Sequence, residues 1–460
     1  MKVLLFGIDS ETEPLGIMYI TVALKNAGHQ VDLELIGAKT SLSDITTSLS
    51  EITAAFKNAG HQVDLESIRA KIFSDIQIKK DYDFVGFSVL TGNHKHLLAL
   101  CQRYREAGIK TIVGGPHATF FTNETLPFAD FVVAGEGIKA VLDIVNGVVE
   151  PGIVRTDLTE ADKFPMADRE ELYKDPKKYN NHIKNMLTGF GCPYSCNYCY
   201  NSLYNQMFPG FLRQRSVDNV IQEAKELIKY PLELIFFQED SFGMNLKWLE
   251  EFAEKWPREI NLLFHSQIRP ESATEKRLQL LKKAGCHGIS VGLETTNEKV
   301  RREVLSRGGT NQEIIEGCKR IKSHGFKLRT YQMIGLPEST IDDDLEMLRW
   351  NYMIQSDFAR ADTYLPLKGT VLGNFCIEKG LWDGNDASFR ELGMDSESVL
   401  NYSPEHKKKL LLLQKIFHLA AKLPDGEKIA KEFINTDQSE FGVFLAMARK
   451  VWMDNLYETQ

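Results

Sequence analysis

The sequence predicts an α/β protein with a doubly wound parallel sheet, then a parallel barrel or partial barrel, and a helical region at the end. Three observations predict this fold. Short apolar segments alternate with segments of helical periodicity, which is typical of parallel sheets. Several strand patterns are almost continuously apolar, as expected for strands buried on both faces. Helical patterns often end at glycine, a preferred residue just beyond a helix C-terminus.

The first region, residues 1–150, has the pattern of a Rossmann-like domain. The apolar run DFVGFSVL at residues 83–90 is typical of a buried central strand, and the helical pattern after it ends at Gly108. Because strands and helices alternate, we expect one doubly wound sheet. The predicted strands are residues 2–7, 31–36, 83–90, 110–115 and 128–134, and the predicted helices are residues 17–27 and 94–107.

Doubly wound sheets bind ligands at the carboxyl ends of their strands. Glycines at these ends would let a ligand approach the backbone closely, although each glycine could also simply turn a corner. The candidate binding residues are Ser88, Thr91, Gly114, Gly115, Pro116, His117, Gly135, Glu136 and Gly137.

A sequence repeat lies inside this region. Residues 20–39 recur as residues 52–71, with an offset of 32 and the stretch KNAGHQVDLE identical in both copies. Two copies are too few for a solenoid, so we interpret them as a local duplication of one helix–strand unit. We expect one copy to supply the second strand of the sheet, and the other to add an edge strand or pack outside. His29 and His61 are expected to be structural residues.

The second region, residues 183–375, follows a polar segment at residues 151–182 whose spaced prolines predict a mostly irregular linker. Six strand patterns alternate with helical patterns, which indicates a partial (βα)6 barrel with its chemistry at the carboxyl ends of the strands. The predicted strands are residues 184–190, 232–237, 261–266, 288–294, 327–334 and 358–365. The predicted helices are residues 217–229, 246–255, 274–284, 298–305, 312–324 and 340–353.

Three of the 7 cysteines, Cys192, Cys196 and Cys199, lie on the loop after the first of these strands. Their spacing, C-x3-C-x2-C, lets three thiolates hold a soft metal centre. A [4Fe–4S] cluster normally takes four thiolates, so three would leave one iron open to another ligand. Zinc is the alternative, but a structural zinc needs four closed ligands and no second pair follows. The remaining cysteines are expected to be buried core residues: Cys101, Cys286, Cys318 and Cys376.

Polar residues at the other strand ends would complete a cofactor pocket. Gln238, Glu239 and Asp240 follow the second strand, and Arg269 follows the third. For a single acidic residue, a helix cap or a surface charge is an equally good interpretation. The joint placement of these residues at one end of the barrel favours the pocket.

With these motifs the sequence resembles a known family. CPYSCNYC resembles the signature loop of radical S-adenosylmethionine (SAM) enzymes, and FFQEDSF, GISVGLET, MIGLPEST and YLPLKGT resemble later segments of the branch shared with B12-type members. The earlier segments PLG, FVGFSV, GGPHAT and GEG resemble the cobalamin-binding domain of B12-dependent radical SAM enzymes. The resemblance covers residues 1–375.

The resemblance implies three cofactors: a [4Fe–4S] cluster, SAM and cobalamin. The three loop cysteines would bind three irons, and SAM would chelate the fourth iron through its amino and carboxylate groups. The implied SAM contacts are Phe237, Gln238, Glu239, Asp240, Ser266, Gln267, Arg269, Glu294, Ile334, Gly335 and Leu336. The implied cobalamin contacts are the nine candidates at the strand ends of the first sheet. The motif Asp-x-His-x-x-Gly is missing, so no histidine is expected to ligate cobalt from below.

The resemblance implies a cobalamin-dependent radical SAM methyltransferase. SAM would be cleaved to a 5′-deoxyadenosyl radical, and an unactivated carbon of a small-molecule or peptide substrate would receive a methyl group from methylcobalamin. The alternatives are a radical SAM enzyme that catalyses rearrangement, cyclisation or oxidation, a phosphorus methyltransferase, and a non-catalytic cobalamin- or iron–sulfur-binding protein. A tRNA methylthiotransferase is disfavoured because the first region carries no set of three cysteines.

The last region, residues 376–460, has helical patterns at residues 404–423, 428–434 and 441–456 and is expected to cap the substrate pocket. Its run KKKLLLL could bind a membrane surface, but a helix packed on the barrel fits the short apolar face better. The net charge of −8 argues against a surface that coats nucleic acid, and no stretch approaches the ~20 apolar residues of a membrane span. We expect a cytoplasmic protein with an electron donor such as flavodoxin or ferredoxin, and no nucleic-acid or membrane partner.

Overall fold

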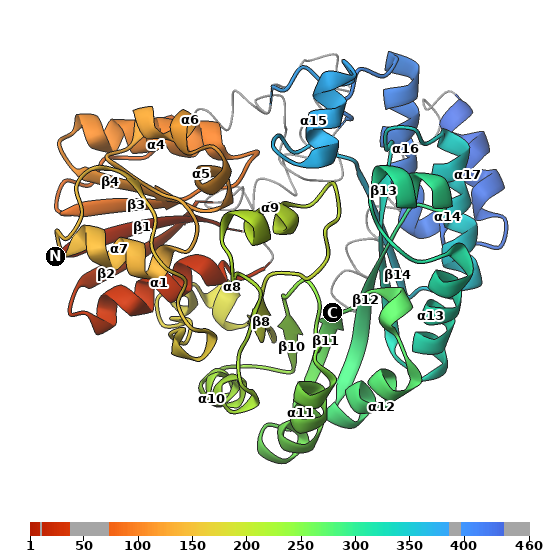
Figure 1. Ribbon diagram of the computed structural model, residues 1–460, viewed down its shortest axis with the longest axis horizontal. Coiled ribbons are helices and arrows are strands. Elements are labelled where there is room, and N and C mark those ends of the chain that lie inside the picture. Colours follow the sequence, from red (N-terminus) through yellow and green to blue (C-terminus); the bar gives the residue numbers. More distant parts are fainter. Residues whose placement is uncertain (10–11, 37–72, 386–396, 437–460) are drawn as a thin grey trace. The chain divides into compact units, whose positions relative to one another are not determined.

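The computed structural model describes residues 1–9, 12–36, 73–385 and 397–436. The chain divides into two compact units, Met1–Asn181 and His182–Gln460, and each is described by itself. Each unit is built on a six-stranded parallel sheet with helices packed on it, as Figure 1 shows. The α/β fold predicted from the alternating patterns is confirmed.

The sheet of the first unit has the strand order β2-β1-β3-β4-β5-β6, and every pairing is parallel. The order changes direction between β1 and β3, the place where doubly wound sheets form their ligand crevice. One face, with Phe6 and Phe87, packs on α4, while Gly7 on the other face approaches Ile17 of α1. The strands are β1 (Lys2–Ile8), β2 (Gln30–Ile36), β3 (Phe84–Ser88), β4 (Lys110–Gly114), β5 (Phe131–Val133) and β6 (Gly152–Val154). The described helices are α1 (Leu15–Asn26), α4 (His94–Glu106), α5 (Pro116–Phe120), α6 (Thr122–Thr125), α7 (Gly137–Val145) and α8 (Pro176–Tyr179), with 3-10 turns at Leu126–Phe128, Ala161–Lys163 and Leu172–Lys174.

The segment predicted as a linker, residues 151–182, differs from that expectation because almost all of it belongs to the first unit. Strand β6 lies within it and pairs in parallel with β5. Asp168 forms an ion pair with Lys25 at 2.6 Å, and Tyr173 donates a hydrogen bond to Glu13 at 2.6 Å. These contacts join residues far apart in the chain, so the local pattern of polar residues and prolines gave no sign of them.

The first copy of the repeat forms part of α1 and all of β2, at the edge of the sheet. It therefore supplies the strand that the sequence predicted second. His29 has a structural contact, because its Nε2 lies 3.1 Å from Oδ1 of Asn146. The second copy, residues 52–71, lies outside the described residues, as does the predicted helix at residues 441–456.

The second unit contains the strand order β14-β13-β12-β11-β10-β7, again all parallel, which confirms the partial six-stranded barrel. The predicted first strand is split, since β8 (Gly189–Phe190) leaves the barrel sheet to pair antiparallel with β9 (Arg213–Gln214). The barrel strands are β7 (Ile183–Met186), β10 (Leu234–Phe237), β11 (Leu263–Gln267), β12 (Cys286–Glu294), β13 (Lys327–Ile334) and β14 (Phe358–Thr363). The described helices are α9 (Tyr200–Met207), α10 (Val217–Leu227), α11 (Leu246–Glu259), α12 (Glu275–Ala284), α13 (Asn311–Ser323), α14 (Ile341–Met353), α15 (Val371–Glu378), α16 (Pro404–Ala420) and α17 (Gly426–Asn435), with a π-helix at Val300–Val304 and a 3-10 turn at Pro270–Ser272.

An aromatic core lies between the barrel strands and their helices. Phe237 of β10 and Phe264 of β11 have ring centroids 5.4 Å apart, and Phe252 and Trp256 of α11 stack at 4.9 Å. Each such side chain buries roughly 150–250 Å², so this cluster is a major source of stability. Because side chains alternate along a strand, the residues between these core positions face the barrel interior.

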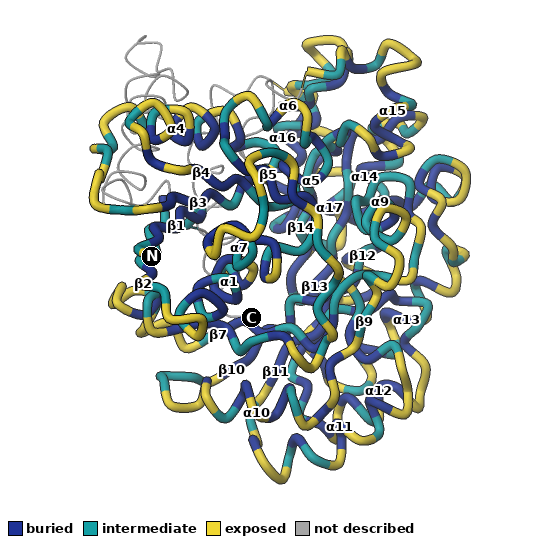
Figure 2. Tube along the Cα trace, turned by 60° about the vertical axis from the view of Figure 1, so that its left-hand side comes forward, coloured by how far each residue is buried: buried dark blue, intermediate teal, exposed yellow. Residues whose placement is uncertain are grey.

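Helix α16 is part of the barrel's core. Leu410, Leu413 and Phe417 of α16 are buried in one cluster with Ile334 of β13 and Ala359 of β14. The prediction that this helix packs on the barrel is therefore confirmed. In Figure 2 the strands of both sheets are largely buried, and exposed residues lie mainly on turns and outer helix faces. None of the described helices combines the length and the apolar character needed to cross a bilayer.

Candidate active site

The cysteine loop connects β8 to α9. All three thiols are free, Cys196 is buried, and Cys192 and Cys199 are half-buried. The described residues contain no set of three His, Cys, Asp or Glu side chains arranged around a single ion. This result is compatible with a [4Fe–4S] cluster, in which the thiolates bind separate irons instead of meeting at one point. The other four cysteines are buried, as predicted.

Two of the three sulfur atoms receive N–H donors from side chains. Nη2 of Arg269 lies 2.8 Å from Sγ of Cys196, and Nδ2 of Asn201 lies 3.7 Å from Sγ of Cys199. The backbone carbonyl of Cys192 accepts a hydrogen bond from Asn205 at 2.7 Å. The loop is therefore oriented by polar contacts at each cysteine.

The middle of the loop is fixed to the barrel by Asn197. Its backbone N–H donates to the carbonyl of Leu305 at 3.0 Å, and its side-chain Nδ2 donates to the carbonyl of Val304 at 2.9 Å. Its carbonyl accepts from the N–H of Leu372 at 2.9 Å. Val304 ends the π-helix after β12, and such single π turns are frequent at functional sites because they redirect backbone groups.

Tyr198, in the same loop, connects the cysteines to the end of β12. Its hydroxyl donates to Oε1 of Glu294 at 3.1 Å, and the same carboxylate forms an ion pair with Arg307 at 3.4 Å. Nη2 of Arg307 also donates to the carbonyl of Gly292 at 2.8 Å. Burial raises the pKa of Tyr198, so its hydroxyl stays protonated and can donate. Glu294 has a backbone φ of 64°, an unfavourable value for this residue type that is typical of functional sites.

Gly292 leaves room for this network. A Cβ atom on Gly292 would overlap Oε1 of Glu294 and lie 3.2 Å from Nη2 of Arg307. Sequence reasoning selected Glu294 but missed Tyr198 and Arg307 as its partners. Tyr198 lies inside the cysteine signature, which was a usable signal, whereas the position of Arg307 carried none.

The acidic run after β10 behaves differently at each residue. Glu239 is buried and accepts hydrogen bonds from the hydroxyl of Thr188 at 2.5 Å and its N–H at 3.3 Å. Burial raises the pKa of Glu239 to about 7, against the lowering effect of these donors. Asp240 accepts a hydrogen bond from Asn201, the same residue that contacts Cys199. Thr188 lies between β7 and β8, at the point where the first predicted strand is interrupted.

Several predicted SAM contacts have side chains committed to the core. Phe237 packs in the aromatic core, and Ile334 and Leu336 lie in apolar clusters. The hydroxyl of Ser266 is 3.6 Å from Sγ of buried Cys286. By strand alternation Phe237, Ser266 and Ile334 point away from the barrel interior, whereas Leu336 lies beyond β13 in an apolar cluster against which Tyr198 packs. Gly335, which follows β13, donates its N–H to Oδ2 of Asp344 at 2.9 Å.

The candidate cobalamin residues lie at the carboxyl ends of β3, β4 and β5. His117 is buried, with Nδ1 3.1 Å from the hydroxyl of Thr91 and its ring stacked on His94 at 4.2 Å. Glu136 accepts a hydrogen bond from the N–H of Thr159 at 2.7 Å. Ser88, at the end of β3, is half-buried.

Two of the glycines lie in close internal packing, and Gly115 does so against backbone. A Cβ on Gly115, which has a φ of 98°, would lie 2.7 Å from the carbonyl oxygen of Val89. A Cβ on Gly137 would lie 2.8 Å from Cδ1 of Ile20. A Cβ on Gly114 would meet only Val133, at an ordinary 3.6 Å, so packing does not explain that glycine.

Profiles of two families match the chain. The Radical SAM superfamily matches residues 186–350, and the B12 binding domain matches residues 36–145. The chain belongs to the cobalamin-dependent radical SAM family. The cofactors of this family are a [4Fe–4S] cluster, SAM and cobalamin.

The relatives of this radical SAM chain include three proteins named as methyltransferases. The chain is 27% identical to an uncharacterised methyltransferase of Pyrococcus horikoshii, over 67% of this chain and 73% of the relative. It is 24% identical to the bacteriochlorophyllide d C-12(1)-methyltransferase of Chlorobaculum tepidum, over 63% of this chain and 64% of the relative. It is 21% identical to the cytidylyl-2-hydroxyethylphosphonate methyltransferase of Streptomyces wedmorensis, over 68% of this chain and 71% of the relative.

Two solved structures share the fold of this radical SAM protein. The radical SAM methyltransferase TsrM from Kitasatospora setae superposes with a TM-score of 0.61 at 16% identity, over 82% of this chain and 76% of that chain. The cobalamin-dependent radical enzyme OxsB superposes with a TM-score of 0.56 at 15% identity, over 82% of this chain and 55% of that chain. At this identity the likeness concerns the fold alone.

The donor groups of the radical SAM chain fit the family's cofactors. The thiols are free, and Cys196 and Cys199 already receive N–H donors of the kind that orient cluster ligands. In the first unit, Ser88, Thr91 and Gly114 are half-buried at strand ends and so remain accessible to a ligand.

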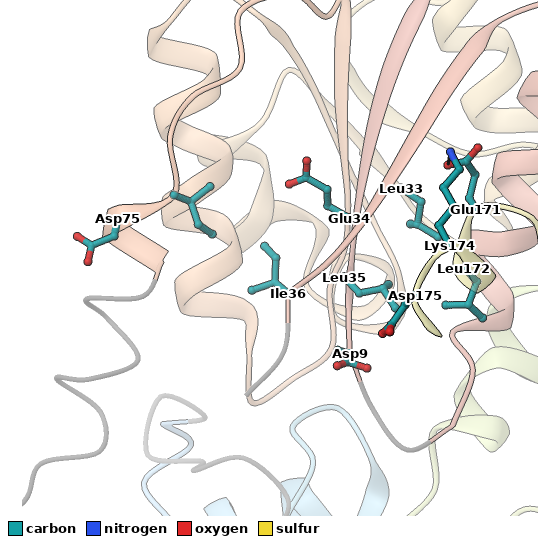
Figure 3. Close-up of a pocket in the computed structure, with 11 residues that line it drawn as sticks. Asp9, Leu33, Glu34, Leu35, Ile36, Asp75, Glu171, Leu172, Lys174 and Asp175 are labelled. Atoms are coloured by element: carbon teal, nitrogen blue, oxygen red, sulfur yellow. Dashed lines mark hydrogen bonds and ion pairs between the residues drawn. The ribbon is translucent and has the colours of Figure 1, made fainter. Parts of the chain in front are cut away.

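A pocket of about 780 Å³ in the first unit, drawn in Figure 3, lies elsewhere in this radical SAM protein. None of the residues predicted to contact a cofactor lines it, and five of its lining residues are carboxylates. We therefore assign it no cofactor. The lining residues are Asp9, Leu33, Glu34, Leu35, Ile36, Asp75, Ile76, Glu171, Leu172, Lys174 and Asp175.

Proposed function

We propose that this protein is a methyltransferase that methylates an unactivated carbon of a small-molecule or peptide substrate, using a [4Fe–4S] cluster, SAM and cobalamin. The observation that carries the proposal is a free three-cysteine loop at the barrel's strand ends in a chain that also has a B12-binding domain. The three relatives described above are methyltransferases by name, which supports methyl transfer.

In this proposal Cys192, Cys196 and Cys199 bind three irons and leave the fourth to SAM. When bound, the cluster would supply the electron that cleaves SAM to methionine and a 5′-deoxyadenosyl radical, and cobalamin would supply the methyl group. Asn197 and Tyr198 hold the loop on the barrel, so a cluster bound there would be held in one orientation relative to the strand ends. Fixed placement of this kind is what lets a reactive group act on one chosen atom.

The SAM contacts divide into two kinds. The polar side chains of Gln238, Asp240, Gln267 and Glu294 are candidates for the amino, carboxylate and ribose groups. Phe237, Ser266, Ile334, Gly335 and Leu336 would contribute backbone N–H and carbonyl groups, because the side chains among them lie in the core.

Cobalamin would bind at the carboxyl ends of the first sheet, next to Ser88, Thr91 and Gly114. Gly115, Pro116, His117, Gly135, Glu136 and Gly137 would shape the surrounding turns. The electron would come from a donor such as flavodoxin or ferredoxin. We place the protein in the cytoplasm, because all seven cysteines are free and an open iron needs a reducing compartment.

The test uses the full chain, reconstituted anaerobically with iron, sulfide and hydroxocobalamin and supplied with a reductant and methyl-labelled SAM. We expect 5′-deoxyadenosine to form and the label to appear on cobalamin. Formation of 5′-deoxyadenosine with no label on cobalamin would favour a rearrangement, cyclisation or oxidation instead.

The matched variants change cysteines of different kinds. Replacing Cys192, Cys196 and Cys199 together by alanine should remove the iron and abolish 5′-deoxyadenosine. Cys318→Ala, a buried cysteine of α13, should leave both unchanged. Retained iron and SAM cleavage in the triple variant would refute the assignment of the cluster.

A further inference from the structure

Arg269 is held by three separate contacts. It lies just beyond β11 and is 9% exposed, and its Nη2 donates to Sγ of Cys196 at 2.8 Å. Its guanidinium carbon lies 3.3 Å from the ring centroid of Tyr194, which belongs to the cysteine loop. Nη1 lies 3.4 Å from Oε1 of Glu271. One planar cation therefore contacts the cysteine loop at two residues and its own strand end at a third.

These contacts make Arg269 a poor candidate for binding SAM, the role that the sequence suggested. Reaching a carboxylate of SAM would require the guanidinium to leave the Cys196 sulfur, the Tyr194 ring or Glu271. A planar group stacked on a ring and hydrogen-bonded along its edge loses several interactions when it turns. The sulfur of Cys196, which is 6% exposed, would then lose its charged donor.

We propose that Arg269 is a positioning residue that donates a charge-assisted hydrogen bond to the Cys196 thiolate of the cluster and raises the cluster's reduction potential. The proposal rests on the role of Cys196 in the proposed function. Reduction adds one negative charge to the cluster and its thiolates. A fixed cation and an N–H donor at one sulfur stabilise that charge, and hydrogen bonds to the sulfurs are a known determinant of cluster potentials.

The strength of the effect follows from the donors. Arg269 is charged and contacts its sulfur at 2.8 Å, whereas Asn201 is neutral and lies 3.7 Å from the sulfur of Cys199. Charge-assisted hydrogen bonds are roughly twice as strong as neutral ones. Cys196 is therefore the more strongly stabilised of these two thiolates.

The first experiment is a redox titration of the cluster-loaded full chain without SAM, followed by electron paramagnetic resonance. In Arg269→Gln the ratio of reduced to oxidised cluster at a fixed potential should fall about tenfold, which is about 59 mV for one electron. Arg269→Lys keeps the positive charge but loses the planar guanidinium with its several N–H donors. The ratio of reduced to oxidised cluster should therefore fall less in Arg269→Lys than in Arg269→Gln. A potential unchanged in both variants at full iron content would overturn the proposal.

The control is Arg277→Lys. Arg277 is a buried arginine of the neighbouring α12 that donates to the carbonyl of Gly243 at 3.0 Å and contacts no sulfur among the described residues. Its replacement should leave the cluster potential within error of the wild type. An equal shift in Arg277→Lys would mean that any lost arginine lowers the potential, which would also contradict the proposal.

A second measurement needs no variant that might fail to fold. Wild-type protein labelled with 15N in the arginine guanidinium should show weak 15N coupling to the reduced cluster in pulsed spectra, without SAM present. Absence of that coupling would overturn the proposal.

If Arg269→Lys loses SAM binding while the cluster potential stays unchanged, Arg269 is a SAM contact and the proposal is wrong. A wild-type chain with a cluster but no methyl transfer would count against the proposed function and leave this inference intact.

Discussion

At the end of β4 in the first sheet a glycine packs against backbone, whereas at the end of β12 in the barrel charged side chains pack on one another. Gly115 packs under the backbone of Val89, while Glu294 is enclosed by Tyr198 and Arg307. In the proposed function the two sites are therefore prepared differently: cobalamin would lie beside a glycine-bearing strand end, and the cluster would be held by a loop that Tyr198 joins to the end of β12.

The largest expected effect is at the barrel end. Arg307→Ala should destabilise the second unit by about 3–5 kcal/mol, because Glu294 would stay buried without its cation. Urea unfolding followed by tryptophan fluorescence measures this, since all 5 tryptophans lie in the second unit. The double variant Arg307→Ala with Glu294→Ala should lose less free energy of unfolding than the sum of the losses in the two single variants. Additive losses would show that the two residues are not coupled.

The matching change in the first sheet is Gly115→Ala. It should destabilise the first unit by about 1–3 kcal/mol, because the new Cβ meets the carbonyl of Val89 at a φ that alanine disfavours. Hydrogen exchange of peptides from β3 and β4 would measure the loss. Gly114→Ala is the control and should keep normal exchange while weakening cobalamin binding. Equal hydrogen exchange in Gly115→Ala and Gly114→Ala would show that packing does not constrain Gly115 more than Gly114.

A pH titration sharpens the comparison inside the barrel. Burial raises the pKa of Asp344 from 3.8 to about 8, although the N–H of Gly335 opposes the rise. The folded state therefore keeps a proton that the unfolded state releases, and the contribution of Asp344 to stability is lost as pH rises from about 4 to about 8. The loss per pH unit should stay below ~1.4 kcal/mol, the limit for one proton. In Asp344→Asn the free energy of unfolding in urea should depend less on pH than in the wild type. An unchanged pH dependence would contradict the raised pKa of Asp344.

The smallest effect is expected for Ser266→Ala. The hydroxyl lies against Cys286 in the core, so its loss should cost less than about 1 kcal/mol. SAM affinity, measured by calorimetry, should stay within about twofold, since only the backbone of Ser266 is available to SAM. A large loss of SAM affinity would mean that the hydroxyl of Ser266 contacts SAM, contrary to this prediction.

Sequence patterns predicted the strands and helices well where apolar residues recur with the regular spacing of one strand or one helix. The strand at Lys327–Ile334 has the bounds that its apolar pattern predicted. Contacts between distant residues were not predictable. Thr188, at the interruption of a predicted strand, bonds Glu239, which is 51 residues away, and Arg269 contacts the sulfur of a cysteine 73 residues away. The three signature cysteines could be selected from their spacing because they lie on one short loop, and their role as cluster ligands stays a prediction.

Gly292 has a consequence for the evolution of this site. Every other amino acid has a Cβ atom, and that atom would collide with the carboxylate two residues later. A lineage that replaces this glycine must therefore move the carboxylate away from Tyr198 and Arg307, give up the acid at the end of β12, or change both positions together. When many related sequences are aligned, these two columns should covary, and sequences without the glycine should also lack the tyrosine–carboxylate–arginine connection to the cysteine loop.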